Sequence, residues 1–337
     1  MMKAARTVCC APGMMQRFAV VCRLPLRRAD DSEPQVLILQ TFSQKTATLL
    51  ALLAAALYAV NIPLSKLLLN HVQPMMMASL LYLGAGLGLW LTGLIRADRE
   101  KPAPVTAKEA PYVAGMILLD IAAPILLMLG LRTADAANAS LLNNFEIVAT
   151  SLIALVIFRE RISGWLGLAI LLVTAASIAL SWEGSGSLRF NGGSLLVLAA
   201  ASCWGLENNC TRMLSHRSAA QTTVLKGFGS GTGSLIVALL GGEGLPAAGW
   251  IPCVLLLGFV AYGLSITCYI RAQYHLGAAR TSAYYSIAPF LGVLLSMLLL
   301  GETPAPLFWA GLGIMIIATL LMLKDTFAAG PEGETDP

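Results

Sequence analysis

The amino-acid sequence predicts an all-α polytopic membrane protein, with ten transmembrane helices arranged as two inverted five-helix repeats. Two observations predict this fold class: long apolar segments recur along the chain, and the two halves of the chain resemble each other. Of the 337 residues, 57% are hydrophobic and 12% are charged. Soluble domains carry roughly 25% charged residues, so this composition does not suit a water-facing surface.

Ten apolar segments of about 20 residues follow one another, each long enough to cross a hydrocarbon core roughly 30 Å thick. They cover approximately 48–69, 74–95, 111–131, 135–157, 164–182, 193–214, 221–240, 249–271, 279–300 and 305–323. We therefore expect one five-helix repeat in 46–182 and a second in 192–324. Residues 1–45 and 325–337 lack apolar segments of this length, and we expect them to be disordered tails.

The two repeats are visible in the sequence as pairs of similar segments. Tyr58–Lys66 aligns with Trp204–Arg212, and Asp135–Leu155 aligns with Gly277–Met297. Because each half contains an odd number of spans, the second half must cross the membrane in the opposite sense to the first. Inverted repeats of this kind usually enclose a binding site between them, near the middle of the bilayer.

The basic residues predict the orientation in the membrane. If the N-terminus is inside, all but three of the 22 Lys and Arg residues fall in internal segments, the exceptions being Lys66, Arg132 and Arg189. The positive-inside rule therefore predicts that both termini are cytoplasmic. We expect a bacterial inner (plasma) membrane protein. The net charge of +4 follows from this asymmetry and does not indicate nucleic-acid binding.

Three carboxylates lie inside the apolar segments: Asp120, Glu146 and Glu207. Each costs roughly 2.5–3.5 kcal/mol at the bilayer centre on insertion scales, so each is a candidate functional residue. Glu146, near the middle of the fourth span, is expected to lie deepest and is the strongest candidate. For Asp120 a structural pairing with Arg132 is an equal alternative.

Other polar residues accompany these carboxylates at helical spacing, which predicts polar stripes that face protein or a water-filled cavity. The stripes are Ser140, Asn143, Glu146 and Thr150; Trp204, Glu207, Asn208 and Thr211; and Tyr58, Asn61 and Ser65. Tyr285, Tyr58 and Trp204 could stack on an organic solute, or simply pack. The Ser and Thr hydroxyls could equally hold helices together. The candidate substrate-binding residues are thus Glu146, Asn143, Glu207, Asn61, Trp204, Tyr58, Tyr285 and Asp120.

Three prolines mark positions where helices are expected to open. Proline has no N–H, so Pro63 frees the carbonyl of Ala59, Pro124 frees that of Asp120, and Pro289 frees that of Tyr285. The counterpart of Pro289 in the first half is Ile147, beside Glu146. We therefore expect a helix break in the second half where the first half has a carboxylate. Passive kinks are the alternative.

The order of these features resembles the drug/metabolite transporter superfamily, in its EamA-type branch. The resemblance rests on IALVIFRERISGWLGLAILLVTAASIAL, LLLGETPAPLFWAGLGIMIIATLLM, WGLENNCTRMLS and YHLGAARTSAYYSIAPF, and it covers about 47–323. It implies a secondary carrier that moves a small organic metabolite, such as an amino acid or a drug-like solute, and often exports it. It also implies a central site and alternating access.

The residues leave the coupling mechanism and the functional class open. Burial favours the protonated form of a carboxylate, so proton coupling through Glu146 and Glu207 fits, and a uniporter is the alternative. The alternative from another class is a non-transporting membrane scaffold or a lipid-handling partner protein. No cofactor, metal, enzymatic activity or nucleic-acid partner is expected. The partners are a small-molecule substrate, protons and the lipid bilayer, and the chain is expected to be a monomer or homodimer.

Overall fold

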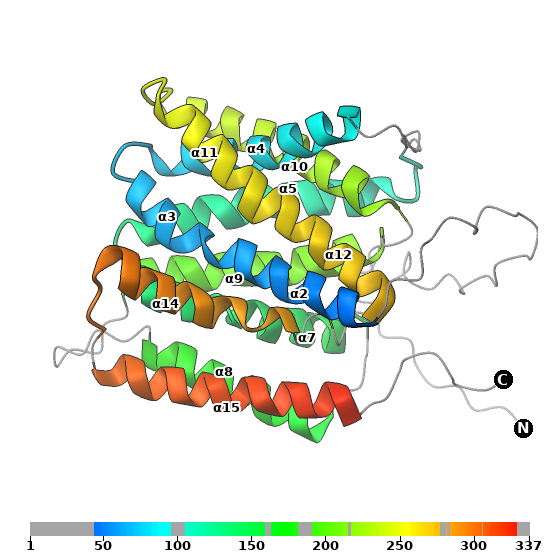
Figure 1. Cartoon of the computed structure of the whole chain (residues 1–337), viewed down its shortest axis with the longest axis vertical. Coiled ribbons are helices and arrows are strands. Elements are labelled where there is room, and N and C mark those ends of the chain that lie inside the picture. The colour runs from blue at the N-terminus through cyan, green and yellow to red at the C-terminus, as the bar shows by residue number, and fades with distance from the viewer. Residues whose placement is uncertain are drawn as a thin grey trace, which may run out of the picture.

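The computed structural model describes 44–95, 105–158, 163–180, 191–214, 217–276, 281, 284–304 and 306–328. Within these ranges all regular structure is helical, as the composition predicts (Figure 1). Residues 1–43 and 329–337, which make up most of the two predicted tails, lie outside the described residues.

The first half contains α2 (Gln44–Ala59), α3 (Asn61–Leu68), α4 (Pro74–Ile95), α5 (Ala110–Leu131), α6 (Ala136–Leu142), α7 (Phe145–Phe158) and α8 (Gly164–Leu180). The second half contains α9 (Gly192–Arg212), α10 (Ala219–Leu240), α11 (Trp250–Gly258), the π-helix η1 (Phe259–Leu264), α12 (Ser265–Leu276), α14 (Ala288–Leu300) and α15 (Pro306–Ala328).

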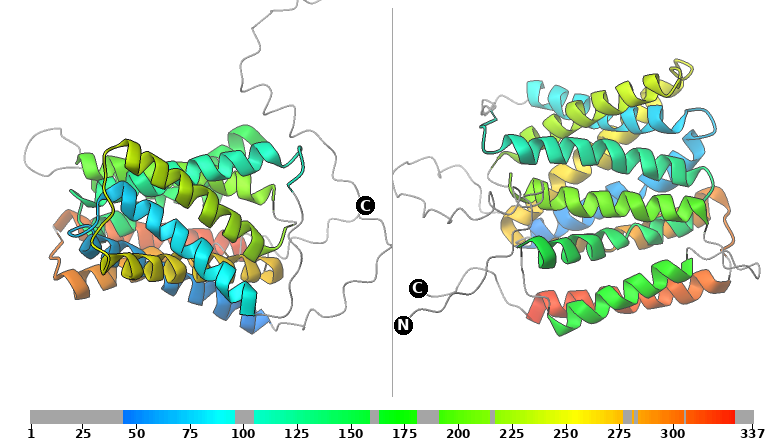
Figure 2. Two further views of the ribbon diagram at one scale, coloured as in Figure 1. Left: turned by 90° about the horizontal axis from the view of Figure 1, so that it is seen from above. Right: turned by 180° about the vertical axis from the view of Figure 1, so that it is seen from behind.

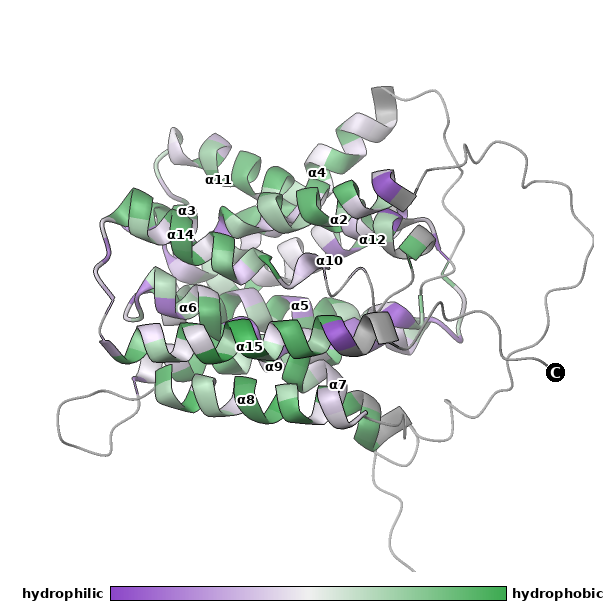
Figure 3. Ribbon diagram, turned by 60° about the horizontal axis from the view of Figure 1, so that its bottom comes forward, coloured by the Kyte–Doolittle hydropathy of each residue, from purple (hydrophilic) through white to green (hydrophobic). Residues whose placement is uncertain are grey.

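Six helical stretches in the described part of the chain are long and apolar enough to cross a membrane, and α8 and α14 are shorter apolar helices. Figure 3 shows hydrophobic residues along the bodies of helices such as α8 and α15. Large apolar side chains are exposed on the outside, including Leu171 and Leu298, which suits contact with lipid. The protein is therefore an integral membrane protein of the all-α class, and ten crossings stay a prediction.

The helix packing follows the inverted repeat. Helix α5 of the first half packs along α9 of the second half. The counterpart of α5 is the span formed by α11, η1 and α12, and it packs along α2 of the first half. The helices α4 and α10 are counterparts and pack on each other, as do α8 and α15 (Figures 1 and 2). Exchanging the two halves therefore reproduces the same set of contacts, as expected for two repeats related by a pseudo-two-fold axis.

Glycines set the closest approach in this packing, where α4 crosses α10. A Cβ atom built on Gly227 would lie 2.4 Å from the Cα atom of Gly86. No side chain fits at that separation, so the backbones touch. Small residues allow such contact between membrane helices, where dispersion rather than hydrophobicity drives association.

We expect Gly227→Leu to lower the melting temperature in detergent strongly, because the new side chain must push α4 and α10 apart. Overpacking of this kind costs about 1–3 kcal/mol, and more when backbone must move. Gly93→Leu is the matched control, since a Cβ at Gly93 of α4 meets nothing within 4 Å. Equal melting temperatures for the two variants would contradict the close crossing.

Three predicted spans are interrupted near their middle. The first breaks between α2 and α3 at Val60, and the fourth breaks between α6 and α7 at Asn143–Asn144. The ninth has a turn at Ser286–Ile287, just before α14. Val60, Asn143 and Ile287 keep right-handed helical dihedral angles, so these interruptions are local turns within the spans. Discontinuous helices of transporters often lie at the binding site.

Two expectations about these breaks are wrong. Helix α5 continues unbroken through Pro124. The fourth span, where a carboxylate and no break was expected opposite the ninth, opens without a proline. Its turn is held by i→i+3 bonds, in which the Asn144 N–H donates to the Leu141 carbonyl at 3.0 Å and the Glu146 N–H donates to the Asn143 carbonyl at 3.1 Å. Asparagine side chains compete for backbone partners and so favour turns over helix interiors. The predicted stripe of Ser140, Asn143, Glu146 and Thr150 is consequently divided between α6 and α7.

Candidate functional site

A buried ionic cluster lies where α5, α9 and α10 meet. The Nζ atom of Lys226 is 3.0 Å from Oε1 of Glu207 and 3.2 Å from Oδ2 of Asp120. The exposed fractions are 6% for Lys226, 2% for Glu207 and 0% for Asp120. Because an unpaired charge at such burial is strongly unfavourable, the ammonium group and the two carboxylates stabilise one another. The cluster joins a helix of the first half to two helices of the second.

Neutral side chains donate further hydrogen bonds within this cluster, and Oδ2 of Asp120 keeps only its ion pair with Lys226. Tyr82 of α4 donates its hydroxyl to Oδ1 of Asp120 at 2.8 Å, and Trp204 donates Nε1–H to the Tyr82 hydroxyl at 3.4 Å. The hydroxyl of Thr211 donates to Glu207 from the next turn of α9. Each carboxylate thus has the charged partner and one hydroxyl donor, which fixes its orientation.

A layer of tyrosines lies beside the ionic cluster. The ring centroid of Tyr262 is 5.0 Å from that of Tyr82 and 5.9 Å from that of Tyr58, and Tyr58 is 5.9 Å from Tyr285. Asn61 donates to the Tyr262 hydroxyl at 3.1 Å. Tyr262 belongs to η1, and single-turn π-helices often occur at functional sites. The aromatic layer draws on helices of both halves.

Glu146 lies in the first turn of α7 and is half-buried. Its Oε1 accepts a hydrogen bond from Nδ2 of Asn208 at 2.7 Å, across the contact between α7 and α9. Among the described residues it forms no ion pair, although it lies within electrostatic reach of Glu207 and Lys226. Glu146 is less buried within the bundle than Asp120 and Glu207, and its depth in the membrane stays a prediction.

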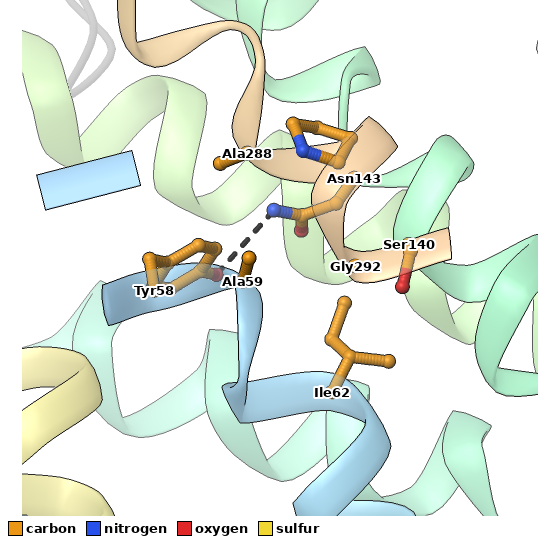
Figure 4. Close-up of a pocket in the computed structure, with 8 residues that line it drawn as sticks. Tyr58, Ala59, Ile62, Ser140, Asn143, Ala288 and Gly292 are labelled. Atoms are coloured by element: carbon orange, nitrogen blue, oxygen red, sulfur yellow. Dashed lines mark hydrogen bonds between the residues drawn. The ribbon is translucent and has the colours of Figure 1, made fainter. Parts of the chain in front are cut away.

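A small pocket opens where the three interrupted spans meet, and Figure 4 shows it. It is lined by Tyr58, Ala59, Ile62, Ser140, Asn143, Ala288, Pro289 and Gly292. Nδ2 of Asn143 donates to the Tyr58 hydroxyl at 3.4 Å (Figure 4). Its cavity volume is about 10 Å³, room for about one water molecule and far below the roughly 300–1,000 Å³ of sites for drug-sized ligands. In this conformation the pocket does not accommodate an organic solute.

Seven of the eight candidate residues belong to the ionic cluster, the tyrosine layer or the pocket. The eighth, Glu146, lies at the contact between α7 and α9, where it bonds Asn208. The sequence missed Lys226, Tyr82, Tyr262 and Asn208 as members of the candidate site. Lys226 was counted among the internal basic residues, but it lies inside α10 and is the partner of Asp120, in place of the suggested Arg132. The carboxylates were selected because a charge inside an apolar segment is energetically costly. The same criterion would have selected Lys226.

A helical membrane protein with two inverted repeats, and with a buried polar site between them, belongs to the class of transporters. The comparison with known families agrees. The chain belongs to the EamA-like transporter family, which it matches over 45–182 and 191–324.

Individual proteins similar to this chain are distant in sequence, and the similarity covers most of the chain. An uncharacterized transporter of Methanothermobacter thermautotrophicus is 24% identical over 289 residues, which is 80% of this chain and 83% of the relative. The uncharacterized inner membrane transporter YedA of Escherichia coli K12 is 25% identical over 270 residues, 77% of this chain and 85% of the relative. A probable terminal-alkyne amino-acid exporter of Streptantibioticus cattleyicolor is 26% identical over 240 residues, 68% of this chain and 78% of the relative.

A solved crystal structure shares the fold. It has a TM-score of 0.65 with 17% sequence identity, and the alignment covers 86% of this chain and all of that chain.

Proposed function

We propose that the protein is a secondary active transporter that exports a small organic metabolite of the amino-acid type by alternating access. The observation that carries the proposal is the buried polar site itself. Three carboxylates, one ammonium group and a layer of tyrosines lie between the halves, at the point where three spans are interrupted. Ordinary packing of membrane helices does not need ionisable groups at mid-membrane. The amino-acid exporter among the relatives supports the substrate class.

The charges favour coupling to protons. Lys226 supplies one positive charge, whereas Asp120, Glu207 and Glu146 supply three negative charges when all are ionised. Burial disfavours an excess of negative charge, so a proton or a cationic solute would stabilise the site. We propose that Glu146 exchanges the coupling proton, because Asp120 and Glu207 are already held by Lys226.

The test is flux into proteoliposomes that contain the purified protein. Radiolabelled L-leucine, L-phenylalanine and L-lysine are supplied outside, with and without an imposed pH gradient. We expect uptake of at least one of them above that of protein-free liposomes, with a rate that changes with the gradient. Uptake that ignores the gradient would support a uniporter. Absence of uptake with correctly inserted protein would support the alternative of a non-transporting membrane scaffold.

The orientation is a separate prediction. Figure 1 shows that α2 begins and α15 ends at the same end of the helix bundle, which suits an even number of crossings. Reporter fusions at Lys45 and after Lys324 should therefore both indicate the cytoplasm, when the protein is expressed in a bacterial inner membrane. A periplasmic signal from either fusion would contradict the ten-span arrangement and the positive-inside assignment.

A further inference from the structure

Two turns at one end of the helix bundle are built in the same way. Within the described ranges, positive φ angles occur at Gly242, after α10, and at Gly301, after α14, with values of 78° and 64°. Glycine adopts this left-handed conformation without strain, so the chain bends sharply away from each helix. A glutamate follows in both turns, Glu243 after Gly242 and Glu302 after Gly301. Figure 1 shows both turns at the end of the bundle opposite the start of α2, which we call the distal end.

Glu302 binds the start of α6, in the other half of the protein. Its carboxylate accepts hydrogen bonds from the backbone N–H groups of Ala136 and Ala137, at 2.8 Å each. Asp135 occupies the N-cap position of α6 but forms no capping bond with its side chain, so Glu302 of the second half takes that role. Lys66 lies within electrostatic reach of Glu302 and further stabilises the carboxylate.

Glu243 binds the start of α4 in the same way. Its carboxylate accepts hydrogen bonds from the backbone N–H groups of Met75 and Met76, at 3.2 and 2.7 Å. The first N–H groups of a helix have no partner inside the helix, and hydrogen bonds to a charged acceptor are about twice as strong as neutral ones. His71, which precedes α4, stacks its ring on that of Trp250, the first residue of α11, with 4.0 Å between the centroids. The loops that precede α4 and α11 are therefore joined at two points.

The contact made by Glu302 connects two walls of the small pocket. Ser140 and Asn143 line the pocket from α6 and the turn after it, and Pro289 and Gly292 line it from α14. Glu302 follows the end of α14 by two residues and binds the start of α6. It therefore limits how far these two helices can separate at the distal end, which the predicted orientation places outside the cell.

We propose that Glu243 and Glu302 form a latch that closes the distal side of the site and opens whenever the solute passes on that side. The inference rests on the proposed alternating access and assigns residues to one of its two steps. Carriers built from inverted repeats expose the site by moving one repeat or bundle against the other. Both contacts join the second half to the first, so this movement breaks them.

Capping of a helix does not by itself need contacts between the halves. Helix α9 is capped locally, where Oδ1 of Asn191 accepts a hydrogen bond from the N–H of Ser194 at 3.1 Å. A local cap of this kind stays intact when the two halves separate. The caps that Glu243 and Glu302 provide for α4 and α6 exist only while the distal end is closed, so they favour the closed arrangement.

The experiment measures how fast a thiol in the pocket reacts with a membrane-impermeant maleimide. Ser140→Cys supplies the thiol, since Ser140 lines the pocket and is 1% exposed, and alanine replaces the seven native cysteines of the full chain. Thr303→Cys, at an exposed distal position, identifies the side of the membrane that this end faces. The reagent is then added on that side, to whole cells or to inverted membrane vesicles.

The variant that tests the latch combines Glu243→Gln with Glu302→Gln. Glutamine keeps the size of the side chain but loses the charge and one of the two acceptor oxygens. We expect the labelling rate of Ser140→Cys to rise at least tenfold in this variant. An unchanged rate, with or without a lower melting temperature, would reduce the two glutamates to structural caps and overturn the inference.

Glu109→Gln is the matched control, because Glu109 also joins the two halves but does so at the opposite end of the bundle. Its carboxylate accepts hydrogen bonds from Nε and Nη2 of Arg217, at 2.8 and 2.9 Å. We expect no faster labelling from the distal side in this variant. An increase equal to that of the latch variant would show a general loosening of the bundle and overturn the inference.

Flux into proteoliposomes separates this inference from the proposed function. Flux by the original protein, together with unchanged labelling in the latch variant, would overturn the latch and leave the transport function intact. Faster labelling in the latch variant, without flux of any solute tested, would support the latch but contradict the transport function.

Discussion

Lys226→Met is expected to destabilise the protein more than any other single substitution in the site. The change removes the ammonium group that lies 3.0 Å from Glu207 and 3.2 Å from Asp120, and it leaves two carboxylates buried beside each other. Breaking a buried ion pair by removing one partner costs about 3–5 kcal/mol. We expect a large fall in melting temperature, or a loss of folded protein after extraction in detergent, measured by size-exclusion chromatography.

A triple variant separates lost pairing from lost packing. Lys226→Met combined with Asp120→Asn and Glu207→Gln has no buried charge in the cluster, and well-packed neutral replacements of buried ion pairs are often tolerated. We expect its melting temperature to recover toward that of the original protein. If Lys226→Met alone is as stable as the original, the three groups do not form a paired cluster. If the triple variant is no more stable than Lys226→Met, the lysine acts through packing.

Glu146→Gln is expected to leave folding and yield nearly unchanged but to abolish transport or its dependence on pH. Glutamine keeps the hydrogen bond with Asn208 and removes only the charge and the exchangeable proton. Because Glu146 has no ion-pair partner among the described residues, its neutralisation exposes no buried counter-charge. The measurements are the melting temperature and gradient-driven uptake in proteoliposomes.

Glu207→Gln is the comparison for this prediction. It should weaken transport less, because Asp120 still pairs with Lys226 and because the repeat counterpart of Glu207 is the neutral Asn61. Normal, pH-dependent transport by Glu146→Gln would show that Glu146 only joins α7 to α9. A greater loss in Glu207→Gln than in Glu146→Gln would move the coupling role to the ionic cluster.

The sequence by itself determined the membrane class, the repeat and the family, because these depend on local properties. A run of about 20 apolar residues predicts a span wherever it occurs, and segment similarity reveals the repeat without coordinates. The same reasoning singled out Asp120, Glu146 and Glu207, since a charge inside an apolar run is costly in any membrane fold. Pro63 and Pro289 likewise marked two of the interruptions through the missing N–H alone.

The tertiary structure alone decided which of these groups act together. Lys226 follows Asp120 by more than a hundred residues. Only the packing of α5 against both α9 and α10 brings Lys226 within reach of Asp120 and Glu207. The interruption at Asn143–Asn144 also escaped the sequence, because asparagine leaves a helix only where the surroundings offer other partners. Pairing and burial depend on which helices meet, so the distinction between the paired carboxylates and Glu146 is a property of the assembled bundle.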